Sequence, residues 1–336
     1  MRQLRIAFAM FLSASLAAHA QAKLQSLNFI QPTGKGRIVI PLSDQRRWQR
    51  VTFVPANDFS PGGPSIFLHD TPTKLEIVYS LSGNHTHSAK DCLDSAMEVL
   101  EKGLATGSAH ADIKPGQKSE ATSASGQPML TGSFLVTAKA GAKTSEQHVY
   151  AVVASRDTCA EIQVEKTDYS PADDAVIQAA LQTVNLDADY APVSTDYFLM
   201  ATLITQLSQG RGFIGSAAYD QRALDTLPAD APAAIRRILI DRLSTAYARS
   251  GQAEKSRAAN EAAIKTDADY PMYYYNLARV DAENFKAAEA KAHLQQAWDR
   301  KANLPAAQQM PDPTQDPSLQ KLKTKADFWT YVQGLK

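Results

Sequence analysis

The chain has 336 residues, 44% of them hydrophobic, and its 35 basic residues balance its 35 acidic residues. This length is typical of two domains, and the apolar fraction is enough to build a core in each. Because the charge is balanced and no basic block is present, we expect no nucleic acid or anionic lipid as a partner.

The first 22 residues have the pattern of a secretory signal peptide. Arg2 and Arg5 precede an apolar run from Ile6 to Leu16, and small residues dominate positions 18–22. The run is shorter than the roughly 20 residues of a membrane-spanning helix. We therefore predict that residues 1–22 are cleaved and that the protein is periplasmic or secreted, without stable membrane insertion. The alternative is a disordered start on a cytosolic protein.

Residues 23–190 are predicted to form an α+β sandwich domain, an antiparallel sheet with packed helices. Alternating apolar residues predict strands near 38–42, 51–53, 75–81, 129–138, 147–155 and 158–166. Capping signals predict one helix that begins at Ser88 and a second that begins in Ser170–Asp173. A turn is predicted at Pro61–Pro64, and the stretch Ala105–Gln127, rich in small and polar residues, predicts a mobile hairpin or loop.

This order of elements resembles the PsbP/Mog1-like α+β sandwich, which is found in some exported bacterial proteins ahead of helical repeats. The resemblance depends on the order of strands and helices and on the helix start Ser-Pro-Ala-Asp-Asp at positions 170–174. It includes no diagnostic motif. That family contains binding and assembly factors, and a fold alone does not assign a role.

The sequence contains two cysteines, Cys92 and Cys159. An even number in an exported protein favours a disulfide over two buried free thiols, which is the alternative. If Ile162 and Val164 face the core, strand alternation places Cys159 on the opposite face. The bridge then requires the helix of Cys92 to cover that face, or a bulge in the strand.

Residues 196–305 carry an apolar pattern that recurs every 34 residues. The equivalent pairs are Ile240 and Tyr274, Leu243 and Leu277, and Ala263 and Ala297. The small residues allow the two helices of a hairpin to approach closely, and Gly251 suits the left-handed end of a helix. The pattern resembles that of tetratricopeptide (TPR) proteins, so we predict an all-α array of TPR-like helical hairpins.

The predicted array is short and irregular. A third, weaker copy lies upstream of the other two, beyond an insertion near Pro228–Ala234, which gives about three hairpins. Polar residues stand at Asp220, Asn260 and Asp281, where the pattern has large apolar or aromatic side chains. Residues 306–336 are predicted to form a linker and a C-terminal capping helix. The alternative for the whole segment is an unrelated helical bundle.

In TPR proteins the first helix of each hairpin lines a concave groove, so the resemblance implies which residues contact a partner. The equivalent positions here are Asp241, Thr245 and Arg249 in one repeat and Tyr275, Arg279 and Glu283 in the next. Arginine and tyrosine together suit a peptide with an acidic group or a carboxy terminus. The lysine–asparagine clamp of chaperone-binding members is absent, because an aspartate occupies a clamp position. A merely solvated polar face is the alternative.

We find no motif of a hydrolase, metalloprotease, redox dithiol or phosphate-binding loop. Gly210–Gly215 has a glycine spacing known from nucleotide sites but follows a predicted helix. His85-Thr86-His87, with Asp91, Cys92 and His69-Asp70, is a weak metal candidate because no further ligand has a known spacing. We therefore expect no catalytic residue, metal or cofactor, and predict an exported protein-binding or scaffold protein. The rival is a small-ligand- or metal-binding protein or enzyme with its site in the α+β domain.

Overall fold

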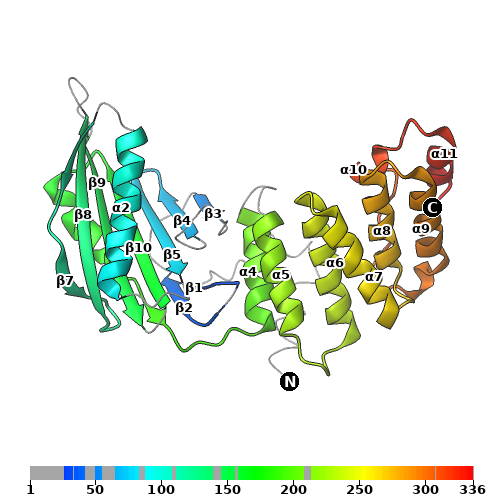
Figure 1. Cartoon of the computed structure of the whole chain (residues 1–336), viewed down its shortest axis with the longest axis horizontal. Helices are drawn as coiled ribbons and strands as arrows, with labels where there is room; N and C mark the ends of the chain where they lie inside the picture. Colours follow the sequence, from blue (N-terminus) through cyan, green and yellow to red (C-terminus); the bar gives the residue numbers. More distant parts are fainter. Residues whose placement is uncertain are drawn as a thin grey trace. The chain divides into compact units, whose positions relative to one another are not determined.

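The computed structural model describes residues 26–32, 34–41, 50–54, 65–82, 88–107, 111–138, 145–155, 158–207, 213–306 and 308–335. The chain divides into two compact units after Gly215. The predicted signal peptide, the Pro61–Pro64 turn and His85-Thr86-His87 lie outside the described residues. Figure 1 shows strands in the N-terminal unit and helices in the C-terminal unit.

The N-terminal unit is built on an eight-stranded antiparallel sheet. The strand order is β3-β4-β5-β10-β9-β8-β6, and β7 also pairs with β8. The strands are β3 (Arg50–Val54), β4 (Ser65–Asp70), β5 (Leu75–Ser82), β6 (Ala111–Pro115), β7 (Ser119–Thr122), β8 (Pro128–Ala138), β9 (Ser145–Ser155) and β10 (Thr158–Thr167). A smaller sheet has the order β1 (Ser26–Ile30), β2 (Arg37–Pro41) and β11 (Leu186–Asp187). The antiparallel α+β prediction is confirmed.

Two strands lie in a stretch that the sequence predicted to be a mobile hairpin or loop. Both β6 and β7 pair with β8 and extend the sheet at its edge. The described side chains from Asp112 to Thr122 are exposed or half-buried, so no apolar alternation marks these strands. Edge strands need backbone pairing more than a buried face, which is why the pattern missed them.

Helices cover the two faces of the large sheet. The first, α2 (Ala89–Gly107), begins where Asp91 Oδ2 accepts from the Ser88 backbone nitrogen at 3.0 Å, as the capping signal predicted. It packs on β8 and β9 (Figure 1). A second, α3 (Asp174–Leu181), follows the 3₁₀ turn Pro171–Asp173 and packs on β9 and β10. The helix α4 (Ser194–Leu207) also belongs to this unit and contacts β1 and β3.

Cys92 and Cys159 form a disulfide across the α2 face, with Cα atoms 6.5 Å apart. Both pack with Phe134 and Tyr150, which are buried between α2 and the sheet. Ile162, three residues after Cys159, is fully buried on the opposite face. The alternation argument therefore holds, and α2 covers the face that the bridge required.

The C-terminal unit is helical. Its helices are α5 (Phe213–Asp225), α6 (Ala233–Arg249), α7 (Ala253–Thr266), α8 (Pro271–Glu283), α9 (Ala287–Asp299), α10 (Pro317–Gln320) and α11 (Ala326–Gly334). Consecutive helices from α6 to α9 pack on one another, most extensively within the pair α8 and α9. The predicted third hairpin is divided, because α4 belongs to the N-terminal unit. No helix in the described ranges has the length and apolar content that a bilayer crossing requires.

The 34-residue period of the sequence reappears in the helix boundaries. The ends of α6 and α8 are 34 residues apart, and so are the starts of α7 and α9. The connection within each pair carries a residue with positive φ, Gly251 at 76° and Phe285 at 58°, again one period apart. Leu243, Leu277, Ala263 and Ala297 are all buried, as their equivalence requires.

Phe285 occupies the left-handed conformation that Gly251 adopts without cost. Its side chain is 67% exposed, so its packing contributes too little stability to compensate for the strained backbone conformation. We expect Phe285→Gly to raise the free energy of unfolding by about 1 kcal/mol, measured by urea denaturation. Phe285→Ala removes the same aromatic ring but keeps the strained backbone, so it should give no gain. Equal stabilisation by both variants would contradict the backbone explanation.

The polar residues that depart from the repeat pattern are buried, and each makes at least one side-chain hydrogen bond. Asp220 accepts from Arg242 Nε at 3.0 Å, and Asp281 Oδ2 lies 2.6 Å from His293 Nδ1. Asn260 Nδ2 donates to a serine hydroxyl of α6 at 2.6 Å. Hydrogen-bonded partners thus replace the apolar contacts that the pattern leads one to expect.

Candidate partner-binding surface

The six predicted groove residues lie on two neighbouring helices, three on α6 and three on α8. Arg279 Nη1 donates to Thr245 Oγ1 at 3.4 Å, and Asn276 Nδ2 donates to Asp241 Oδ1 at 2.8 Å. The α6 row (Asp241, Thr245 and Arg249) and the α8 row (Tyr275, Arg279 and Glu283) therefore lie side by side. Burial raises the pKa of the Asp241 carboxyl, although the hydrogen bond from Asn276 opposes the shift. Arg249 lies at the end of α6 and is exposed.

The C-terminal segment of the chain, residues 308–335, contacts the α8 side of this predicted groove. Tyr275 Oη donates to Asp316 Oδ2 at 3.1 Å, and Arg279 Nε lies 3.3 Å from the same oxygen. The other oxygen of Asp316 accepts from the backbone nitrogen of Ser318 at 2.9 Å, where it caps α10. Glu283 pairs with Lys321. A carboxylate thus lies where the resemblance implies an acidic ligand, but it belongs to the chain itself.

This segment is firmly attached. Leu319, Leu322, Phe328 and Val332 are buried and join the core formed by α6 to α9. Burial of each such side chain contributes about 1.5–3 kcal/mol relative to exposure. Tyr275 is buried as well, and burial together with Asp316 raises the pKa of its phenol. The contacts of the segment are therefore part of the folded unit.

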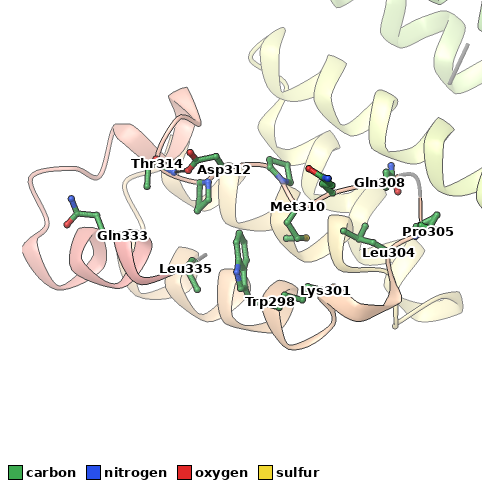
Figure 2. A pocket seen from close by; sticks show the side chains of 14 residues that line it. Trp298, Lys301, Leu304, Pro305, Gln308, Met310, Asp312, Thr314, Gln333 and Leu335 are labelled. Carbon is green, nitrogen blue, oxygen red and sulfur yellow. Dashed lines mark hydrogen bonds between the residues drawn. The ribbon is translucent and has the colours of Figure 1, made fainter. Parts of the chain in front are cut away.

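A recess remains open beside this segment, with a volume of about 680 Å³. Figure 2 shows it between α9, residues 304–306 and 308–314, and the end of α11. Apolar side chains of Trp298, Leu304, Met310 and Leu335 line it. Polar residues also line it, among them Gln309, which is exposed to solvent at its edge. A largely apolar recess with a few polar groups is the usual form of a small binding site.

The repeat pattern did not indicate this recess. Most of its lining lies in residues 306–336, predicted as a linker and a capping helix, and the rest lies at the end of the predicted repeats, including Trp298 of α9. The available signal was composition: residues 304–314 combine prolines with Leu304 and Met310, which are unusual in a solvated linker.

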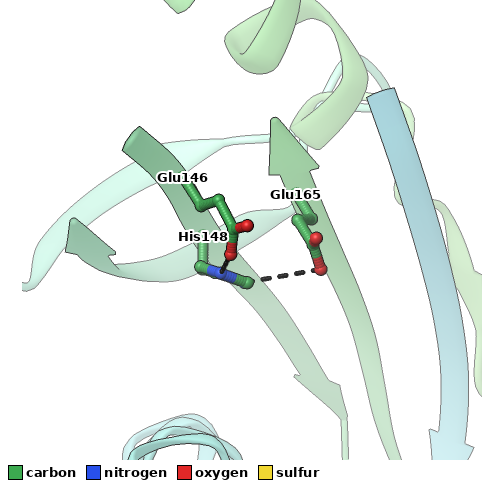
Figure 3. Close-up of side chains that lie close together, drawn as sticks. All are labelled: Glu146, His148 and Glu165. Atoms are coloured by element: carbon green, nitrogen blue, oxygen red, sulfur yellow. Dashed lines mark ion pairs between the residues drawn. The ribbon is translucent and has the colours of Figure 1, made fainter. Parts of the chain in front are cut away.

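A second group of polar residues lies on the α2 face of the large sheet. His148 of β9 stands directly opposite Glu165 of β10, and Glu146 precedes it by two positions on the same face. Figure 3 shows the imidazole between the two carboxylates. Its Nε2 lies 3.6 Å from Glu146 Oε2, and its Nδ1 lies 3.7 Å from Glu165 Oε2.

Charge and burial shift the titration of this face. Burial raises the pKa of Glu165. The nearby imidazole of His148 opposes this shift, whereas the negative charges of Glu76 and Glu146 add to it. Glu161 precedes Glu165 by four residues on the same face of β10. Burial alone raises the pKa of Glu161 to about 7. The carboxyl groups of Glu161 and Glu165 are therefore harder to ionise than free carboxyl groups in water.

The described members of the weak metal candidate serve other roles. His69 Nδ1 lies 2.6 Å from Glu76 Oε2, and Asp70 Oδ2 accepts from the Thr73 hydroxyl at 2.7 Å. Asp91 caps α2, and Cys92 is in the disulfide. These side chains are therefore not gathered into one site.

No protein-family model matches this chain, and no curated protein sequence matches it. Among solved structures, the chain is similar to the solution structure of cyanobacterial PsbP (CyanoP) from Synechocystis sp. PCC 6803. The match covers 50% of this chain and 96% of that protein, with 10% sequence identity and a TM-score of 0.34. A likeness of this degree assigns no function.

Proposed function

We propose that this is an exported, non-enzymatic protein that binds a protein or peptide partner through its helical unit. In this proposal α6 to α9 are TPR-like repeats. The observation that carries it is the 34-residue period, which recurs in the ends of α6 and α8, the starts of α7 and α9, the buried leucines and the two positive-φ connections. Arrays of this kind act as binding scaffolds. The disulfide is compatible with an oxidising compartment, such as the periplasm or the exterior.

The partner is proposed to contact the open recess rather than the α8 row of the predicted groove. Tyr275, Arg279 and Glu283 already contact the C-terminal segment, which a partner would have to displace at the cost of a buried core. The recess presents Trp298 and Met310, and aromatic and methionine side chains are typical anchors at interfaces. An extended apolar segment of a partner protein fits this lining.

Photo-crosslinking in intact cells tests the proposal. A benzophenone amino acid at Gln309, at the edge of the recess, is expected to capture one recurrent protein, identified by mass spectrometry. The matched control places the same amino acid at Gln320, an exposed glutamine at the end of α10. This position lies outside the recess, so no capture is expected there. Equal capture at both positions, or none at either, would count against the recess.

A blocking substitution supplies the complementary test. Ala306 lines the recess and is exposed, so Ala306→Arg fills the recess without removing any buried contact. We expect it to weaken capture of the identified partner at least tenfold. Ala288→Arg, at an exposed position of α9 outside the recess, should leave capture unchanged. Arg249→Ala tests in the same assay the exposed member of the predicted groove.

A further inference from the structure

His148 is the one buried side chain of the α2 face whose ring nitrogens both lack a hydrogen-bond partner among the described residues. Its side chain is 4% exposed. The neighbouring carboxylate oxygens lie beyond hydrogen-bond distance, at 3.6 and 3.7 Å, so they interact with the ring by charge alone. A buried imidazole without hydrogen bonds is costly, and such a group calls for an explanation.

Strand register explains why ligand-forming groups meet at this place. Antiparallel pairing sets His69, Glu76, Glu165 and His148 in one row across β4, β5, β10 and β9. Glu146 joins the row from the next position on the same face. Three carboxylates and two imidazoles therefore share one end of the sheet face.

An internal ion pair does not account for this arrangement. A protonated His148 would place a buried charge between two carboxylates and still leave both of its N–H groups without an acceptor in range. A neutral His148 leaves Glu146 and Glu165 without compensation by the ring. A cation among the three groups would satisfy a ring nitrogen and both carboxylates at once.

We propose that Glu146, His148 and Glu165 bind a divalent transition-metal ion of the Zn²⁺ class. One nitrogen and two carboxylate oxygens are ligands that zinc accepts, whereas Mg²⁺ prefers oxygen ligands alone. The three ligand atoms lie within 4.8 Å of one another. The glutamate side chains are 39% and 30% exposed, so they can rotate toward the ion while His148 stays fixed.

The surroundings of the ring support this assignment. Each ring nitrogen faces one of the two carboxylates, so either nitrogen is placed to act as the ligand. With three protein ligands, the remaining coordination positions are open to water. The site is independent of the helical unit, so it stands or falls separately from the proposed function.

Titration calorimetry of the metal-free full chain with Zn²⁺ tests the site. We expect one ion per chain, and at least tenfold weaker binding in each of Glu146→Gln and Glu165→Gln. Both variants keep the side-chain shape at half-exposed positions, so the fold should persist, which circular dichroism verifies. Glu120→Gln, at an exposed position of β7, is the matched control and should bind as the wild type does.

X-ray absorption at the zinc edge distinguishes this site from the other histidines, since the chain has seven. The spectrum is expected to show one imidazole and two carboxylate ligands, and His148→Ala should abolish the imidazole signal. The proposal is overturned if the wild type does not bind Zn²⁺, or if the Glu146→Gln/Glu165→Gln double variant binds it with unchanged affinity.

Discussion

Replacing both cysteines with alanine is expected to lower the free energy of unfolding of the N-terminal unit by about 4 kcal/mol. The bridge joins residues 67 positions apart, so it removes a large loop entropy from the unfolded chain. It also fixes α2 on the sheet beside Phe134 and Tyr150. Urea denaturation, followed by a probe of this unit, measures the loss.

Reduction of the wild-type protein supplies the control for this prediction. The reduced wild type and the double variant should unfold at the same urea concentration, because both lack the covalent link. The helical unit should be unaffected, since the bridge lies entirely within the other unit. A double variant as stable as the oxidised wild type would show that non-covalent packing alone fixes α2.

Removing the buried carboxylate of α8 is expected to destabilise the helical unit nearly as much. Asp281 is 1% exposed and holds Arg257 and His293, whose side chains are 20% and 24% exposed. Asp281→Ala leaves those two groups without their buried partner, which should cost about 3 kcal/mol. Asp299→Ala, at an exposed position of α9, is the control and should change stability by less than about 0.5 kcal/mol.

The same carboxylate predicts the response of this unit to acid. Burial by itself would raise the pKa of Asp281, but the hydrogen bonds from His293 and Arg257 outweigh it and lower the pKa below the ordinary value of 3.8. Its contribution is therefore present above pH 3.8 and is lost as the pH falls through the lowered value. Denaturation midpoints measured across this range should fall steeply for the wild type and less for Asp281→Ala. Parallel curves would contradict this.

The spacing of apolar residues predicted the elements reliably wherever a strand or helix had one buried face and one solvated face. Alternation along β10 placed Cys159 and Ile162 on opposite faces, and the helix of Cys92 covers the face that the alternation required. The capping pairs at Ser88 and Ser170 marked their helix starts because such signals are local in sequence. These features depend on a few neighbouring residues.

Features that join distant residues left no such pattern. The strands β6 and β7 were missed because their side chains bury little on either face. Asp316 lies 41 residues from Tyr275, outside the repeat, so nothing in the sequence indicated that it would occupy the α8 row. The juxtaposition of His148 and Glu165 likewise depends on strand register, which a single sequence does not specify.

The burial of the final helix constrains the order in which the helical unit can be made. Val332 of α11 is fully buried, and α11 is the last helix that the structure describes. The core around α8 and α9 therefore remains incomplete until α11 has been synthesised, whatever local helix forms earlier. Leu335, which follows α11, lines the recess, so a fusion close to this position would lie near it. An affinity tag is for that reason better placed elsewhere when partner binding is measured.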